Sequence, residues 1–272
     1  MKFDVVVVSK DRDSLLKRQI KRIKNRFPYN KIIVVDSTST PFRFIIDKDV
    51  EYYHTPNVKL GFARKKGVSA VSTPFFFMID DDIDFAKGTA EKMYEALRKY
   101  GAEVFAMSPQ ILFGKNKNIL SVYKRKKADT EGVSSGFCII SLEKLKLIGG
   151  FNRLIHIGED AELFYRAKRH GYKWIRKHDI FVNHPCTDSE FIFKTWGHRQ
   201  GIMTSVSYGF DTYHGLIIKR FRDMLLNLLS FMKHRNFRTT MFLISSDFIC
   251  ILAYLRGIVG GKNYALHKKT FV

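Results

Sequence analysis

Hydrophobic residues in this chain form short uninterrupted runs that alternate with segments of helical periodicity. The runs at residues 3–9 (FDVVVVS), 31–37 (KIIVVDS) and 74–80 (PFFFMID) are rich in β-branched and aromatic residues. Such runs are typical of strands buried on both faces. Between the first two, residues 11–27 carry apolar side chains at helical spacing behind polar residues suited to an N-cap. The pattern predicts strands and helices in alternation.

The alternation continues along the chain, with predicted helices at 60–72 and 87–101 and another strand at 102–109. Strand and helix alternate four times within about 110 residues, which predicts an α/β fold with a mostly parallel sheet flanked by helices on both faces. A polar and basic segment at 111–132 is interpreted as a loop or hairpin, after which strands and helices resume.

Two regions are expected. Residues 1–190 form the α/β domain, and residues 191–272 show only helical patterns, which predicts a C-terminal helical appendage. The stretch 241–261 approaches the length of a membrane span, but Asp247 and Arg256 would be costly within lipid. A helix that packs on the domain or lies at a membrane surface fits this stretch better.

The charge balance is strongly basic, with 47 Lys and Arg against 26 Asp and Glu and a net charge of +21. A surface of this sign favours polyanions, anionic lipid or phosphorylated ligands. Nucleic-acid-binding motifs of the recognised kinds are absent, so no nucleic-acid partner is expected. Three widely spaced cysteines and the lack of a signal peptide at the N-terminus predict a reducing, cytoplasmic location.

Polar side chains mark the ends of the predicted strands. Ser9 and Asp36 end the first two strands, and Asp80, Asp81 and Asp82 stand at the end of the run that begins at residue 74. Because ligands of parallel sheets bind at the carboxyl ends of the strands, these side chains are expected on one edge. Three adjacent carboxylates repel one another unless a cation relieves them. Since Mg²⁺ and Mn²⁺ bind one or two carboxylates plus phosphate oxygens, the cluster predicts a metal–phosphate site.

Other candidates have an ordinary structural alternative. Asp36 is either a turn residue or a hydrogen-bond partner of a ribose or base. Glu159 and Asp160 open a helix, where acidic side chains commonly stabilise the macrodipole, although one carboxylate directed at a site would serve as a general base. His184 ends a strand and is either structural or a metal ligand. Trp174 is either a packing residue or a ring that stacks on a sugar.

The order of these features resembles the family 2 glycosyltransferases, inverting enzymes of the GT-A fold that use nucleotide-activated sugars. The resemblance covers residues 1 to about 210. VVVVSKDR, IIVVDSTST, NVKLGFARKKGV and FMIDDD are similar to successive segments of the family's donor-binding half. SSGFCIISLEKLKLIGGFN followed by GEDAELFYRAKRHGYKW resembles its acceptor-side segment and E-D motif. This last pairing is the most specific match.

The resemblance implies a role for each candidate residue. Asp160 is implied as the catalytic base, with Glu159 and Trp174 on the acceptor side. Asp82 and His184 are implied as ligands of Mn²⁺ or Mg²⁺. The residues implied to bind the nucleotide sugar are Ser9, Arg12, Asp36, Arg64, Asp80 and Asp81.

The expected reaction is single displacement. A metal on Asp82 neutralises the leaving diphosphate, and Asp160 deprotonates an acceptor hydroxyl that attacks the anomeric carbon from the opposite face. Lys66 stands where the family usually has Asn, and Lys10 with Asp11 replaces Tyr–Asn in the first turn. Residues 193–201 lack the Q-x-x-R-W of processive polymerising members, which favours the addition of a single sugar.

The partners implied are a nucleotide-diphosphate sugar and an acceptor that the sequence does not identify. Residues 216–272 hold ten Lys and Arg and two acidic residues, interleaved with apolar runs. This composition suits either a helical subdomain or an interfacial surface on anionic membrane. Peripheral attachment at the cytoplasmic face of a membrane is the expectation, and a lipid-linked acceptor is a hypothesis.

Two alternatives remain open. A sugar-phosphate nucleotidyltransferase would use the same sheet edge and metal, but it would usually carry a glycine-rich phosphate loop after the first strand, and VSKDRDS has no glycine. A non-catalytic basic protein that binds membrane or nucleic acid would account for the charge. It would leave the Asp80–Asp82 and Glu159–Asp160 groups unexplained.

Overall fold

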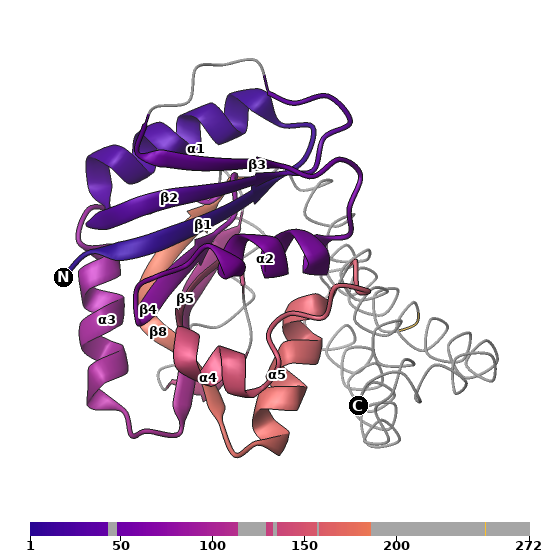
Figure 1. Cartoon of the computed structure of the whole chain (residues 1–272). Helices are drawn as coiled ribbons and strands as arrows, with labels where there is room; N and C mark the ends of the chain where they lie inside the picture. The colour runs from indigo at the N-terminus through magenta and orange to yellow at the C-terminus, as the bar shows by residue number, and fades with distance from the viewer. Residues whose placement is uncertain (43–47, 114–128, 133–134, 157, 186–247, 249–272) are drawn as a thin grey trace, which may run out of the picture. The chain divides into compact units, whose positions relative to one another are not determined.

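The computed structural model describes residues 1–42, 48–113, 129–132, 135–156, 158–185 and 248 (Figure 1). The chain divides into two compact units, Met1–Cys186 and Thr187–Val272. Of the predicted helical region 191–272, only Phe248 is among the described residues. No helix in the described part of the chain is both long and apolar enough to cross a membrane.

Strands and helices alternate as the hydrophobic pattern predicts. Within the described residues, eight strands form one sheet in the order β3-β2-β1-β4-β7-β5-β8-β6. The strands are β1 (Phe3–Ser9), β2 (Tyr29–Asp36), β3 (Val50–His54), β4 (Phe75–Ile79), β5 (Val104–Phe113), β6 (Thr130–Glu131), β7 (Phe137–Ser141) and β8 (Lys173–His184). The helices are α1 (Asp13–Arg26), α2 (Leu60–Ser69), α3 (Thr89–Lys99), α4 (Leu142–Leu147) and α5 (Glu159–Arg169).

The sheet is mostly parallel, which confirms the predicted fold class. The pairs β1–β2, β1–β4, β2–β3 and β5–β8 are parallel, whereas β7 runs antiparallel to both of its neighbours, β4 and β5. The antiparallel strand β7 follows the basic segment 111–132. Within that segment β5 extends to Phe113 and the short strand β6 pairs with β8. Residues 114–128 lie outside the description.

Helices cover both faces of the sheet (Figure 1). The apolar stripes of α1 and α3, such as Leu16 and Met93, pack against one face, and α4 and α5 pack against the other with Leu145 and Leu163. Helix α2 lies on the second face, where Gly67 leaves no room for a Cβ, because that atom would come within 2.5 Å of Val6. Helices on both faces require strands that are apolar on both sides, as the continuous hydrophobic runs indicated.

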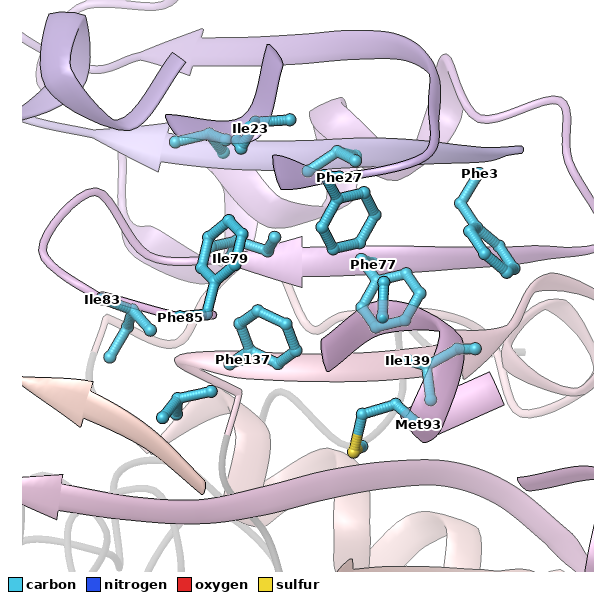
Figure 2. Packing of buried hydrophobic residues seen from close by; sticks show 14 of the residues in the cluster. Phe3, Ile23, Phe27, Phe77, Ile79, Ile83, Phe85, Met93, Phe137 and Ile139 are labelled. Carbon is cyan, nitrogen blue, oxygen red and sulfur yellow. The ribbon is translucent and has the colours of Figure 1, made fainter. Parts of the chain in front are cut away.

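An aromatic cluster anchors the centre of the sheet (Figure 2). The ring of Phe77 on β4 lies edge-on to Phe27 and Phe137, with centroids 4.7 and 5.7 Å apart, and also meets Phe3 at 5.2 Å. Each such edge-on pair contributes roughly 0.5–1.5 kcal/mol beyond its buried area. The chain that leaves β4 is held in the same core, since Phe85 lies 5.3 Å from Phe137. The aspartates between these anchors thereby acquire a fixed position.

Candidate active site

Three strand ends meet at one edge of the sheet. Because β1 is paired with both β2 and β4, the carboxyl ends of these strands are neighbours. Ser9 and Asp36 are directly paired, and the backbone N–H of Ser37 donates to the carbonyl of Ser9 at 2.9 Å. Asp80 follows the last residue of β4. The structure thus brings the predicted polar strand ends together, as expected for a parallel sheet.

The turn after β4 is held by backbone contacts. The N–H of Asp80 donates to the carbonyl of Gly136 at 2.8 Å, and the buried amide of Gln19 on α1 donates to the carbonyl of Asp80 at 3.0 Å. A Cβ at Gly136 would lie 3.1 Å from Asp80 Oδ2, so a larger residue would crowd this carboxylate. Ile83 is fully buried and closes the turn. The three aspartates are therefore presented by a fixed backbone.

One arginine compensates two of the aspartates. Arg12 Nη1 lies 2.9 Å from Asp81 Oδ1 and 2.8 Å from Asp82 Oδ2, and the hydroxyl of Ser9 donates to Asp81 Oδ2 at 2.5 Å. His184 Nε2, at the end of β8, lies 3.4 Å from Asp82 Oδ1. Burial raises the pKa of Asp81, and the hydrogen bond from Ser9 and the charge of Arg12 oppose the rise. We call Ser9, Arg12, Asp81, Asp82 and His184 the Arg12 cluster.

The Arg12 cluster fits a divalent metal that arrives with phosphate. Asp82 and His184 direct an oxygen and a ring nitrogen toward each other, and this donor pair suits Mn²⁺ and related ions. Among the described residues, no three His, Cys, Asp or Glu side chains form a group able to hold a metal ion by themselves. Ions of this class commonly complete their coordination with substrate phosphates and water. The residues therefore fit a metal bound jointly with a diphosphate.

A second arginine organises a buried group beside the first. Arg64 on α2 donates through Nη1 to the hydroxyl of Ser135 and to the carboxylate of Glu159, and its Nη2 lies 3.3 Å from Asp80 Oδ1. The hydroxyl of Ser135 lies 2.9 Å from Asp160 Oδ2, and the Ser135 N–H lies 3.4 Å from the same oxygen. We call Arg64, Ser135, Glu159 and Asp160 the Arg64 cluster.

The helix α5 presents the two acidic members of this cluster at its first turn. Gly158 precedes the helix with a φ of 86°, a left-handed conformation that glycine adopts without strain. Glu159 and Asp160 are buried, with 2% and 4% of their surface exposed. Burial raises the pKa of Glu159 to about 7, although the charge of Arg64 opposes this rise. The charges of Glu159 and Asp80 raise the pKa of Arg64 against the effect of its burial.

Comparison with known proteins identifies the family. The sequence profile of glycosyl transferase family 2 matches residues 4–148, more than half of the chain. This chain belongs to glycosyl transferase family 2. Among curated protein sequences, none matches it. The matched range contains the Arg12 cluster except His184, together with Arg64 and Ser135.

Solved structures of glycosyltransferases share the fold of this family 2 chain. The mannosyltransferase PcManGT from Pyrobaculum calidifontis, in complex with GDP-Man and Mn²⁺, has a TM-score of 0.61 and 15% identity over 98% of this chain and 81% of its own. GalNAc-T7 with UDP, GalNAc and Mn²⁺ has a TM-score of 0.58 and 14% identity over 84% of this chain. The matched region spans only 51% of the GalNAc-T7 chain.

Two predicted site residues of this family 2 protein lie deeper than the sequence suggested. The carboxylate of Asp36 is buried and accepts hydrogen bonds from Thr38, Tyr52 and the N–H of Phe42. Arg64 is 3% exposed, and its guanidinium contacts Ser135, Glu159 and Asp80. These positions point both side chains into the protein.

Trp174 also lies in the core rather than beside the Arg64 cluster. Its ring is fully buried, stands edge-on to Phe105 at 5.5 Å, and packs within the hydrophobic cluster beneath α4 and α5. No ring face is exposed for stacking on a sugar, and the packing alternative accounts for this residue. Trp174 is the second residue of β8, and its side chain points to the face of the sheet that α4 and α5 cover. The sequence pattern did not distinguish this face from the other one.

Sequence reasoning missed two residues of the site. Ser135 connects Arg64 to Asp160, and Gln19 holds the carbonyl of Asp80. Gln19 occupies a buried position between Leu16 and Ile20 on the apolar stripe of α1, and this break in the stripe was a usable sign. Ser135 precedes Gly136 at the entry to β7, where small polar residues are ordinary turn formers.

Proposed function

We propose that this family 2 protein is an inverting glycosyltransferase that moves a single sugar from a nucleotide-diphosphate sugar to an acceptor hydroxyl. The observation that carries the proposal is the proximity of two groups of acidic side chains, one in the turn after β4 and one in the first turn of α5. Asp82 lies with His184 in the Arg12 cluster, Asp160 lies in the Arg64 cluster, and Arg64 also contacts Asp80 beside Asp82. One group suits the diphosphate and the other suits the acceptor.

In this proposal Asp82 and His184 hold Mn²⁺ or Mg²⁺, which neutralises charge on the leaving diphosphate when it is bound. Both similar structures contain Mn²⁺ with a nucleotide or nucleotide sugar, which supports a metal here. Ser9, Arg12, Asp80 and Asp81 lie at the same edge and are the proposed donor contacts. Arg12 carries a positive charge that can pair with phosphate oxygens as readily as with carboxylates.

Asp160 is the proposed general base. It accepts the proton of the acceptor hydroxyl while the acceptor oxygen bonds to the anomeric carbon and the bond from that carbon to the diphosphate breaks. Single displacement needs one such base on the face opposite the leaving group. The hydrogen bonds from Ser135 hold the Asp160 carboxylate as a proton acceptor. Inversion at the anomeric carbon is the expected stereochemical result.

The test is the release of nucleoside diphosphate from a panel of UDP-, GDP- and dTDP-sugars, with and without Mn²⁺. We expect release that depends on the metal and is lost in Asp82→Ala. Asp84→Ala is the matched control, because Asp84 follows in the same turn but pairs with Arg22 and Arg26 outside the Arg12 cluster. A protein that neither binds nor cleaves any donor would refute the proposal. In a parallel assay with a nucleoside triphosphate and a sugar 1-phosphate, release of pyrophosphate would indicate a nucleotidyltransferase.

The acceptor and the membrane remain separate proposals. The absence of Q-x-x-R-W from residues 193–201 favours addition of one sugar. Attachment to the cytoplasmic face of an anionic membrane through residues 216–272, and a lipid-linked acceptor, stay predictions because these residues lie outside the described structure. Co-sedimentation of the full chain with vesicles of anionic or neutral lipid tests the attachment, and equal binding to both would contradict it.

A further inference from the structure

The hydroxyl of Ser135 has its direction set by its two partners. A guanidinium only donates hydrogen bonds, so the Ser135 oxygen must accept from Arg64 Nη1. The single hydroxyl proton is then directed to Asp160 Oδ2, which lies 2.9 Å away. The N–H of Ser135 points to the same oxygen at 3.4 Å. Ser135 therefore contributes two donors to one oxygen of Asp160, and Arg64 prevents the hydroxyl from turning away.

Arg64 is itself held in place from several sides. It forms a buried ion pair with Glu159, and its guanidinium carbon lies 5.9 Å from the centre of the Phe151 ring. The helix that carries it is docked onto the loop before α5, because the N–H of Gly61 donates to the carbonyl of Ile155 at 2.9 Å. A Cβ at Gly61 would lie 2.1 Å from the carbonyl oxygen of Asn152, so only glycine permits this close contact.

We propose that Ser135 is a positioning residue for the reaction, which orients the Asp160 carboxylate through a hydroxyl whose direction Arg64 sets. This inference rests on the proposed role of Asp160 as general base. The inference also changes the expected role of Arg64. This residue fixes Ser135 on the acceptor side of the site and does not bind the nucleotide sugar. Ser135 and Arg64 come from segments 71 residues apart, and Asp160 follows Ser135 by 25 residues.

The consequence is a division between donor binding and transfer. Loss of the Ser135 hydroxyl leaves the Arg12 cluster intact, so the donor should still bind. The carboxylate of Asp160 loses the shorter of its two bonds from Ser135, although the N–H groups of Ser135 and Ala161 still donate to it. Misplacement of a reacting group by about 1 Å costs up to roughly a hundredfold in rate. The effect should therefore fall on kcat for transfer to acceptor, while KM for the donor stays within about twofold.

The experiment compares Ser135→Ala and Ser135→Thr with the matched control Ser72→Ala. Ser72 forms the same kind of contact at the opposite edge of the sheet, where its hydroxyl lies 2.9 Å and its N–H 2.6 Å from Asp4 Oδ2. We expect Ser135→Ala to lower kcat by about 10- to 100-fold. Ser135→Thr, which keeps the hydroxyl, should recover most of this loss, and Ser72→Ala should match the wild type.

Several outcomes would overturn the inference. Unchanged kcat in Ser135→Ala would do so, and so would a Ser135→Thr variant as slow as Ser135→Ala, since volume rather than the hydroxyl would then matter. A crystal structure of Ser135→Ala gives a readout independent of activity: we expect Asp160 to leave its rotamer, and an unmoved carboxylate contradicts the inference. Failure of the proposed function differs, because wild-type protein would then release no nucleoside diphosphate from any donor.

Discussion

The Arg12 cluster and the Arg64 cluster solve the same electrostatic problem in different surroundings. Arg12 lies between Asp81 and Asp82, and Arg64 pairs with Glu159 and Asp80. The side chain of Arg12 is 40% exposed, whereas that of Arg64 is 3% exposed, and Glu159 beside it is equally buried. An exposed ion pair exchanges partners at little cost, but a buried one is expensive to break because it leaves a charge without compensation.

This difference matches what the two halves of a transfer reaction need. The Arg12 cluster must accept and release a charged donor, so a compensating arginine that water can replace is suitable there. In the proposed reaction the Arg64 cluster holds the base in one orientation, for which a permanent buried pair is suitable. Arg64 also lies 3.3 Å from Asp80, the residue that directly precedes Asp81 and Asp82 of the Arg12 cluster. The predictions that follow test this division in order of expected effect.

Asp160→Asn should have the largest effect on catalysis. The amide keeps the shape of the side chain but cannot accept a proton at neutral pH, so transfer to acceptor should fall by roughly 10²- to 10⁴-fold. Nucleotide binding, measured by calorimetry with UDP or GDP and Mn²⁺, should be unchanged. Glu162→Gln is the matched control and should lose much less activity, because Glu162 lies on the same helix but pairs with Arg166. Transfer by Asp160→Asn within threefold of wild type would refute the assigned base.

The two arginines should differ most in their effect on stability. Arg64→Ala leaves Glu159 buried without its cation and should lower the free energy of unfolding by about 3–5 kcal/mol. Arg12→Ala should cost about 1 kcal/mol, because the Arg12 side chain is itself 40% exposed and water can take the place of its guanidinium. Urea denaturation followed by circular dichroism measures both values. Similar losses for the two variants would show that burial does not separate the clusters.

The buried carboxyl of Glu159 should make stability depend on pH. Its pKa is about 7 in the folded protein and has an ordinary value of 4.5. Between these values the folded protein retains a proton that the unfolded chain has released, so stability falls as the pH rises from 4.5 to 7. The expected loss is roughly 1–3 kcal/mol. Unfolding measured across this interval should show a shallower slope in Glu159→Gln, while Glu162→Gln should keep the wild-type slope.

Arg12→Ala should also change the affinity of the Arg12 cluster for a metal ion. The guanidinium of Arg12 lies 2.8 Å from Asp82 Oδ2 and repels any cation that approaches this carboxylate. Without it, Mn²⁺ should bind about tenfold more tightly in the absence of nucleotide. Electron paramagnetic resonance of free Mn²⁺ gives the affinity. Arg26→Ala removes the same charge from α1 at a similarly exposed ion pair with Asp84 and should have no such effect.

Much of the fold followed from local pattern. The continuous hydrophobic runs predicted strands buried on both faces, and apolar spacing on α1 predicted the stripe formed by Leu16, Ile20 and Ile23. The parallel alternation in turn predicted that Ser9, Asp36 and Asp80 would share an edge. These inferences succeed because strand and helix periodicity reflect which side of an element is buried, and each element carries that information in its own residues.

The direction of individual side chains and the pairing of distant ones were decided by the tertiary structure. The pattern could not tell that Asp36 and Trp174 turn inward, because a strand buried on both faces gives no alternation to read. Arg64 meets Glu159 across 95 residues of chain, and Ser135 joins Arg64 to Asp160 only because α2, β7 and α5 converge. The sequence by itself determined the elements and the acidity of one sheet edge. The exposure of Arg12 and the burial of Arg64 depended on tertiary packing. That packing joins segments that are far apart in the sequence.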